Sequence, residues 1–339
     1  MTKRSKRSGK QRQKGKQARR RSKRRASAQR SDSAADHIPS AATLFRFGLL
    51  DPSVMGLMDK ATSLLKPVLW ARDGGNVRQI RRAGTAEEVL DLLPLARGLG
   101  EPEWYKRMRQ FGPEVVSLIS ARLRTVKEIR DEAERDMTVE KLIGALRQHG
   151  DAGVSVLLER FDDLNEYGQS LACVMLGLLG AEASADRIWH FYQTALRKRR
   201  ESHFIGALWG LIDLKDEQAG LALVQLLKSK RFFYELFGFF SLAGDTRAVL
   251  PLLEEIHWRP DERKGDPMMA LIGVAHRIGR EALLAEFEKG AAPDDPREDM
   301  EALANELLAK PIEDVQEYFA LFYRGLTPGD LTRAIARMG

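Results

Sequence analysis

The chain has 339 residues, of which 43% are hydrophobic, and a formal net charge of +7. Its single cysteine, Cys173, excludes an intrachain disulfide, and the lack of any run of about 18 apolar residues argues against a membrane span. The first thirty residues hold 15 of the 55 Lys and Arg and none of the 48 Asp and Glu, which leaves 40 basic and 48 acidic residues for the rest. A basic segment is therefore joined to an acidic body.

Residues 1–40 are predicted to be a disordered basic arm and linker, because like charges repel and almost nothing in them can be buried. A flexible polycation binds nucleic acid or another polyanion by releasing counterions, so nucleic acid or the ribosome is an expected partner. The arm has no aromatic residue, so base stacking is not expected. The cations assigned to this contact are Lys3, Arg4, Lys6, Arg7, Arg19, Arg20, Arg21, Lys23, Arg24 and Arg25.

Two other roles for the arm stay open. It could fold back on the acidic body, or its KRSKR and RRRSKRR segments could act as a nuclear localisation signal in a eukaryote. The expected location is cytoplasmic, or nuclear if the organism is eukaryotic.

Residues 41–84 are predicted to form an N-terminal helical cap. A helix is expected from about Ser53 to Trp70, followed by a loop with a short helix around Gly74 and Gly75. Thr85 is an expected helix N-cap that opens the regular part of the chain.

Residues 85–290 follow a helical period almost throughout, without the alternating β-branched runs of strands. A turn residue followed by a short apolar helix recurs about every 33 residues. The small residues Gly177, Gly210 and Ser241 recur in the helices that precede these turns, which predicts close approach of neighbouring helices. The recurring turn residues are Gly112, Gly150, Gly180, Asp216, Gly244 and Gly279.

The repeated units share a short sequence pattern. It consists, in chain order, of a small residue with Leu-Gly, then Gly-Asp, then Ala-Val and then Leu-Leu, and it is clearest in residues 236–256 and 143–161. It resembles HEAT repeats, and among them the short bacterial type of phycobilisome lyases. The resemblance covers about residues 85–290 and implies an all-α, α-α superhelix, a fold that serves as a scaffold more often than as an enzyme. Residues 291–339 are then a C-terminal helical cap.

The links between units are often basic, so stacked units would place a ridge of cations along one edge, able to contact phosphates. The opposing interpretation is that cations favour helix C-termini in any helical protein. Asp162 and Asp163 interrupt the ridge. Its residues are Arg122, Arg124, Arg197, Lys198, Arg199, Arg200, Lys228, Lys230 and Arg231.

The sequence has no HExxH, Gly-rich phosphate loop or GxSxG motif. Glu254 and His257 make one ExxH pair, but a di-iron site needs two, so a chance surface pair is the better interpretation. Cys173 lies in an apolar helix and is expected in the core, whereas Trp189, Trp209 and Trp258 are candidates either for exposed aromatics or for helix packing. We therefore expect a non-catalytic protein-binding scaffold, with a protein partner on the repeat surface and a polyanion on the arm. The alternative is an enzyme or enzyme subunit of the HEAT-like lyase or DNA-repair type.

Overall fold

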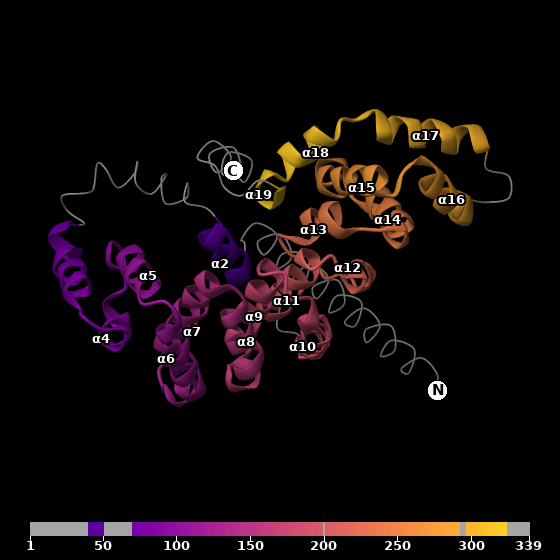
Figure 1. Cartoon of the computed structure of the whole chain (residues 1–339). Coiled ribbons are helices and arrows are strands. Elements are labelled where there is room, and N and C mark those ends of the chain that lie inside the picture. Colours follow the sequence, from indigo (N-terminus) through magenta and orange to yellow (C-terminus); the bar gives the residue numbers. More distant parts are fainter. Residues whose placement is uncertain (1–39, 51–69, 199–200, 292–295, 324–339) are drawn as a thin grey trace, which may run out of the picture.

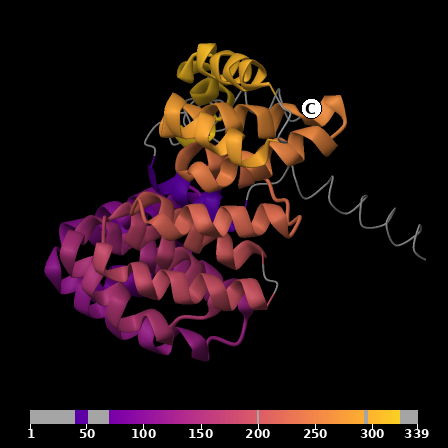
Figure 2. The same cartoon turned by 90° about the vertical axis from the view of Figure 1, so that its right-hand side faces the viewer.

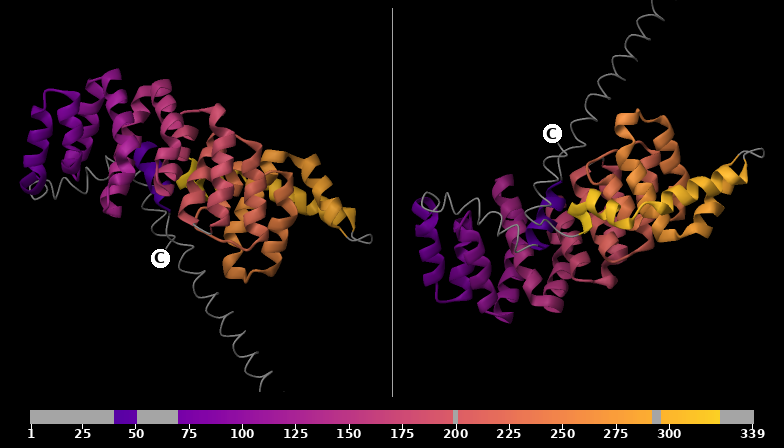
Figure 3. Two further views of the ribbon diagram at one scale, coloured as in Figure 1. Left: turned by 90° about the horizontal axis from the view of Figure 1, so that it is seen from below. Right: turned by 90° about the horizontal axis from the view of Figure 1, so that it is seen from above.

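The computed structural model describes residues 40–50, 70–198, 201–291 and 296–323. Within these ranges the chain is built of α-helices and short 3-10 turns and has no strand, which confirms the all-α prediction. From residue 86 to residue 290, successive helices follow one another along the length of the molecule (Figures 1 and 3). No helix in these ranges is both long and apolar enough to cross a bilayer.

The helices from residue 86 to residue 290 form two layers, and most of them contact both the next helix in the chain and the helix two positions on. Layer A contains α5 (Gly100–Gln110), α7 (Glu132–Leu146), α9 (Glu166–Leu178), α11 (Glu201–Asp213), α13 (Leu236–Ala243) and α15 (Gly265–Ile278). Layer B contains α4 (Ala86–Asp91), α6 (Pro113–Thr125), α8 (Gly150–Arg160), α10 (Ala185–Arg197), α12 (Glu217–Lys228), α14 (Val249–Trp258) and α16 (Arg280–Gly290).

The predicted turn residues mark where the layer B helices begin. Four of these helices (α6, α8, α12 and α16) start at the turn residue or one position after it, and α10 and α14 start after a 3-10 turn. Gly150 and Gly279 have φ values of 50° and 81°, a backbone region that glycine enters without strain. Local turn chemistry therefore fixes these helix boundaries.

The helices at residues 41–50 and 297–323 lie outside the two layers, and each contacts at least one helix of layer A. Helix α2 (Ala41–Leu50) lies against α9 and α11 near the middle of the molecule (Figures 1 and 2). It is far from α4, although only the helical residues 70–82 stand between them among the described residues (Figure 1). At the other end, α17 (Arg297–Ala309) contacts α15 and α16, α18 (Ile312–Tyr318) contacts α15, and α19 (Ala320–Tyr323) contacts α13. The segment 41–84 contributes to two separate places in the fold, because its helical residues 70–82 lie beside the start of α5, where Asp73 accepts a 3.2 Å hydrogen bond from the Leu99 backbone N–H.

The predicted loop around Gly74 and Gly75 is wrong, because residues 70–82 are helical without a break. A Cβ atom on Gly74 would lie 3.2 Å from the indole of Trp70, so the missing side chain makes room for that ring on the helix surface. The expected helix from Ser53 lies outside the described residues. Thr85 caps α4 as predicted, accepting a hydrogen bond of 3.1 Å from the Glu88 backbone N–H.

The small residues of layer A bring its helices into contact, as predicted. A Cβ atom on Gly177 of α9 would lie 2.7 Å from the Cα atom of Gly210 on α11, and one on Gly210 would lie 2.5 Å from the carbonyl oxygen of Cys173. A Cβ atom on Gly273 of α15 would lie 3.1 Å from the Cβ atom of Ser241 on α13. The helix pair α9 and α11 therefore tolerates no side chain at its crossing.

We predict that Gly177→Ala lowers the free energy of unfolding by about 1–3 kcal/mol, because the added methyl group meets backbone that cannot move aside. Gly75→Ala is the matched control: the position is helical, no atom lies within 4 Å of the new methyl group, and alanine should raise stability by about 0.5–1 kcal/mol. Urea unfolding followed by circular dichroism measures both. A neutral Gly177 variant would contradict the close crossing.

Candidate helix-binding site

Helix α2 is stabilised by a cap at its first turn and by the burial of one face. The Ser40 hydroxyl accepts a hydrogen bond of 3.1 Å from the Thr43 backbone N–H, which caps the first turn. Ala42 and Phe45 are buried against the body, whereas Leu44 remains 59% exposed. Because an isolated ten-residue helix is marginal in water, α2 depends on layer A for its helical state.

Arg46 makes the central contact of α2 with α11. Its guanidinium carbon lies 3.8 Å from the centroid of the Trp209 ring, and its Nη1 forms an ion pair with Asp213 Oδ2. Trp209 and Asp213 are four residues apart on α11 and so lie on one face of that helix. The planar guanidinium stacks on the indole and pairs with the carboxylate at once, a combination that suits arginine better than lysine.

Thr43 makes the second contact, one turn before Arg46. Its hydroxyl accepts a hydrogen bond of 3.0 Å from Trp209 Nε1 and donates one of 2.6 Å to Glu235 Oε1. The Ser40 backbone N–H donates to the same carboxylate oxygen over 2.7 Å. Glu235 directly precedes α13, so these bonds join α2 to two neighbouring helices of layer A. We call Trp209, Asp213 and Glu235 the α2-binding surface.

Burial controls the electrostatics of this contact. Removal from water lowers the pKa of Arg46 and raises the pKa values of Asp213 and Glu235, because it disfavours the charged form of each group. The Arg46 Nε–H is buried and finds no hydrogen-bond partner in the described part of the chain. The ion pair is thus well placed but incompletely hydrogen-bonded.

Aromatic side chains from the C-terminal half enclose Trp209. Phe239 of α13 meets it edge-on with ring centroids 4.6 Å apart, and Phe322 of α19 stacks on it at 5.6 Å with an interplanar angle of 19°. A Cβ atom on Gly238 would lie 2.6 Å from the Phe322 ring, so glycine there admits α19. Helices from both ends of the described chain therefore meet at one indole.

A second polar cluster joins α5, α7 and α9. The Lys141 ammonium pairs with Glu101 at 2.9 Å, and the Tyr167 hydroxyl donates a 2.9 Å hydrogen bond to Glu140 Oε2. Burial raises the pKa of Glu140. These side chains pair with one another across the three helices. The cluster therefore has a structural role in holding α5, α7 and α9 together.

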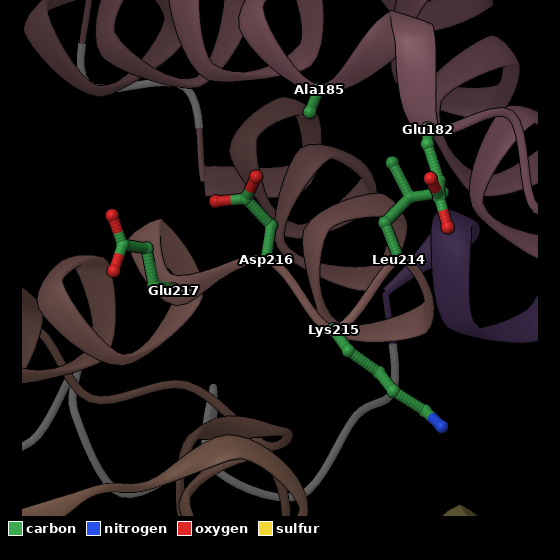
Figure 4. Close-up of a pocket in the computed structure, with 6 residues that line it drawn as sticks. All are labelled: Glu182, Ala185, Leu214, Lys215, Asp216 and Glu217. Carbon is green, nitrogen blue, oxygen red and sulfur yellow. The ribbon is translucent and has the colours of Figure 1, made fainter.

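A pocket of about 370 Å³ lies at the turn between α11 and α12 (Figure 4). Asp216 at its wall accepts a 2.8 Å hydrogen bond from the Gln218 backbone N–H and thereby caps α12, and the Lys215 side chain points away from Asp216 and Glu217. In the ranges that the structure describes, no group of His, Cys, Asp and Glu is arranged to hold a metal ion. The residues lining the pocket are Glu182, Ala185, Leu214, Lys215, Asp216 and Glu217.

The predicted arm residues, together with Arg199 and Arg200 of the predicted ridge, lie outside the described ranges. Three of the other ridge cations are paired with carboxylates: Arg122 with Asp91, Lys198 with Glu166 and Lys230 with Glu255. These pairs reduce the positive charge that the ridge presents.

The remaining ridge residues within the described ranges lie on or next to α6, α10 and α12. Arg231 donates a 3.2 Å hydrogen bond to the Leu196 carbonyl, which brings the ends of α10 and α12 together. Arg197 bonds within its own helix to the Gln193 carbonyl, and Lys228 is exposed at the end of α12. Arg124 is exposed on α6, which contacts α4, α7 and α8.

Sequence reasoning missed the pairing of Arg46 with Trp209. Of the three tryptophans considered, Trp209 is fully buried, Trp189 is half-buried and Trp258 is 73% exposed. Cys173 is buried as expected, and burial raises its pKa. One sequence feature could have predicted that α2 makes a buried polar contact. It is the single arginine, Arg46, inside the apolar run LFRFGLL, six residues after the capping Ser40.

The chain matches no family model, no curated protein and no solved structure. The likeness to HEAT repeats therefore stays a prediction from the sequence. The functional argument rests on the contacts described above.

We predict that Arg46→Ala releases α2 from layer A, because it leaves Asp213 buried without its counter-ion, a loss of about 3 kcal/mol. Amide hydrogen exchange in residues 41–50 should then quicken by about a hundredfold. Leu44→Ala on the exposed face of the same helix is the matched control and should leave exchange almost unchanged. Equal protection in both variants would contradict the role of Arg46.

We predict a pH dependence from Glu235. Because its folded-state pKa is raised, its contribution to stability is greatest below the ordinary glutamate pKa of about 4.3 and is lost as the pH rises through the raised value. The stability of the native chain relative to Glu235→Gln should therefore fall from pH 4 to pH 7. Urea unfolding across this range measures it, with the exposed Glu313→Gln as control. A native chain that gains stability relative to Glu235→Gln as the pH rises would show that the carboxylate is stabilised instead.

Proposed function

We propose that this chain is a non-catalytic scaffold whose helical layers bind a protein partner and whose basic arm attaches to nucleic acid or another polyanion. The observation that carries the proposal is the seating of α2 on layer A. There α11 and the residue preceding α13 hold a helix through stacking, an ion pair and hydrogen bonds. A surface with these groups in place is suited to binding helices.

The proposed architecture is a right-handed α-α superhelix of about five to six HEAT-like units. This architecture is supported by the way the layer A helices pack: each contacts the next one along the layer, in the order α7, α9, α11, α13 and α15. Further support comes from the small residues that let α9 and α11 cross closely. Stacked units of this kind present long surfaces to partners rather than a single catalytic cleft.

The charge distribution supports the second half of the proposal. Fifteen cations lie within the first thirty residues without one carboxylate, whereas the rest of the chain is acidic. Several cations of the body are already paired with carboxylates, including Arg122 and Lys230. We therefore assign phosphate binding to the arm rather than to the body.

We predict that replacing the ten arm cations assigned above by glutamine weakens RNA binding and flattens its salt dependence, because fewer counterions are released. Fluorescence anisotropy with labelled single-stranded RNA between 50 and 200 mM KCl would measure both. A chain with a scrambled arm of unchanged composition should bind like the native one. Unchanged affinity in the glutamine variant would contradict the proposal for the arm.

A further inference from the structure

Helix α2 reaches its binding surface from a distant part of the sequence. Arg46 and Asp213 are 167 residues apart, and Thr43 and Glu235 are 192 residues apart. The nineteen residues 51–69 separate α2 from the next described helix. Helix α2 therefore binds layer A as a separate peptide ligand would, except that it belongs to the same chain.

We propose that the α2-binding surface binds a short helix of a partner protein with the same chemistry as α2, and that α2 is the tethered internal competitor for this surface. The partner helix carries a hydroxyl residue three positions before an arginine, among apolar residues. This inference rests on the proposed scaffold function and names its partner class.

The two carboxylates and the indole define what is recognised. Asp213 and the Trp209 ring favour a planar cation, because a guanidinium stacks flat on the ring and pairs with the carboxylate at once, which suits arginine better than lysine. Trp209 Nε1 and Glu235 together require a group that accepts one hydrogen bond and donates another, which is a hydroxyl. A spacing of three residues puts both groups on one face of a helix.

Several features make α2 replaceable. A ten-residue helix does not hold its shape alone, so docking must also order it. The Arg46 Nε–H is buried without a hydrogen bond, and a buried ion pair about breaks even against its desolvation. The advantage of α2 is that it belongs to the same chain as its binding surface, because a covalently linked ligand binds at a raised effective concentration. A partner that offers one more contact, or is itself tethered nearby, can displace it.

The test uses a fluorescent synthetic peptide of residues 40–50 and the full-length chain. The Arg46→Ala chain should bind the peptide at least tenfold more tightly than the native chain, because its own α2 no longer competes. Thr43→Ala, which keeps the ion pair, should give a smaller gain. Adding Asp213→Asn to the Arg46→Ala chain should weaken binding about tenfold, and a peptide with alanine at position 46 should bind at least tenfold more weakly than the native peptide.

Circular dichroism establishes that each variant is folded before titration, and Thr43→Ala replaces Arg46→Ala if the latter unfolds. Equal binding by the native and Arg46→Ala chains, or binding that ignores the peptide arginine, would overturn the proposal. Sedimentation of the native chain as a dimer that Arg46→Ala dissolves would assign the surface to a second copy instead, which also overturns it. The assay contains no polyanion, so its failure leaves the RNA result for the arm unaffected.

Discussion

The contact of the Arg46 guanidinium with the Trp209 ring and the Asp213 carboxylate sets the arrangement of the middle of the molecule. It fixes α2 on layer A, and the same indole receives Phe322 from α19. Neither α2 nor α19 is long enough to be stable alone. The helical state of both therefore depends on a tryptophan that neither helix contains.

The close crossing of α9 and α11 makes this contact available. Gly177 and Gly210 remove the side chains that would separate the two helices, and Trp209 and Asp213 flank that crossing on the α11 side. Because α2 contacts both helices, a shift of one against the other would move Asp213 relative to Arg46. The same small residues that define the layers thus position the α2-binding surface.

Local signals were sufficient to predict much of the fold and insufficient to predict the site. Gly150, Asp216 and Gly279 mark helix starts through turn and cap chemistry that acts over a few residues. The partners of Arg46 and Thr43 lie more than 160 residues away, and no short-range pattern encodes such a pairing. Gly74 and Gly75 misled the prediction because glycine marks a loop unless a neighbouring ring such as Trp70 occupies the space it leaves.

The most direct test of this account is a double-mutant cycle between Arg46 and Asp213. Arg46→Ala, Asp213→Ala and the double variant are unfolded with urea beside the native chain, and the coupling free energy is taken from the four values. Direct contact between the two side chains predicts a favourable coupling of about 1–3 kcal/mol. A coupling near zero would mean that the two residues do not meet and that α2 does not bind layer A as described.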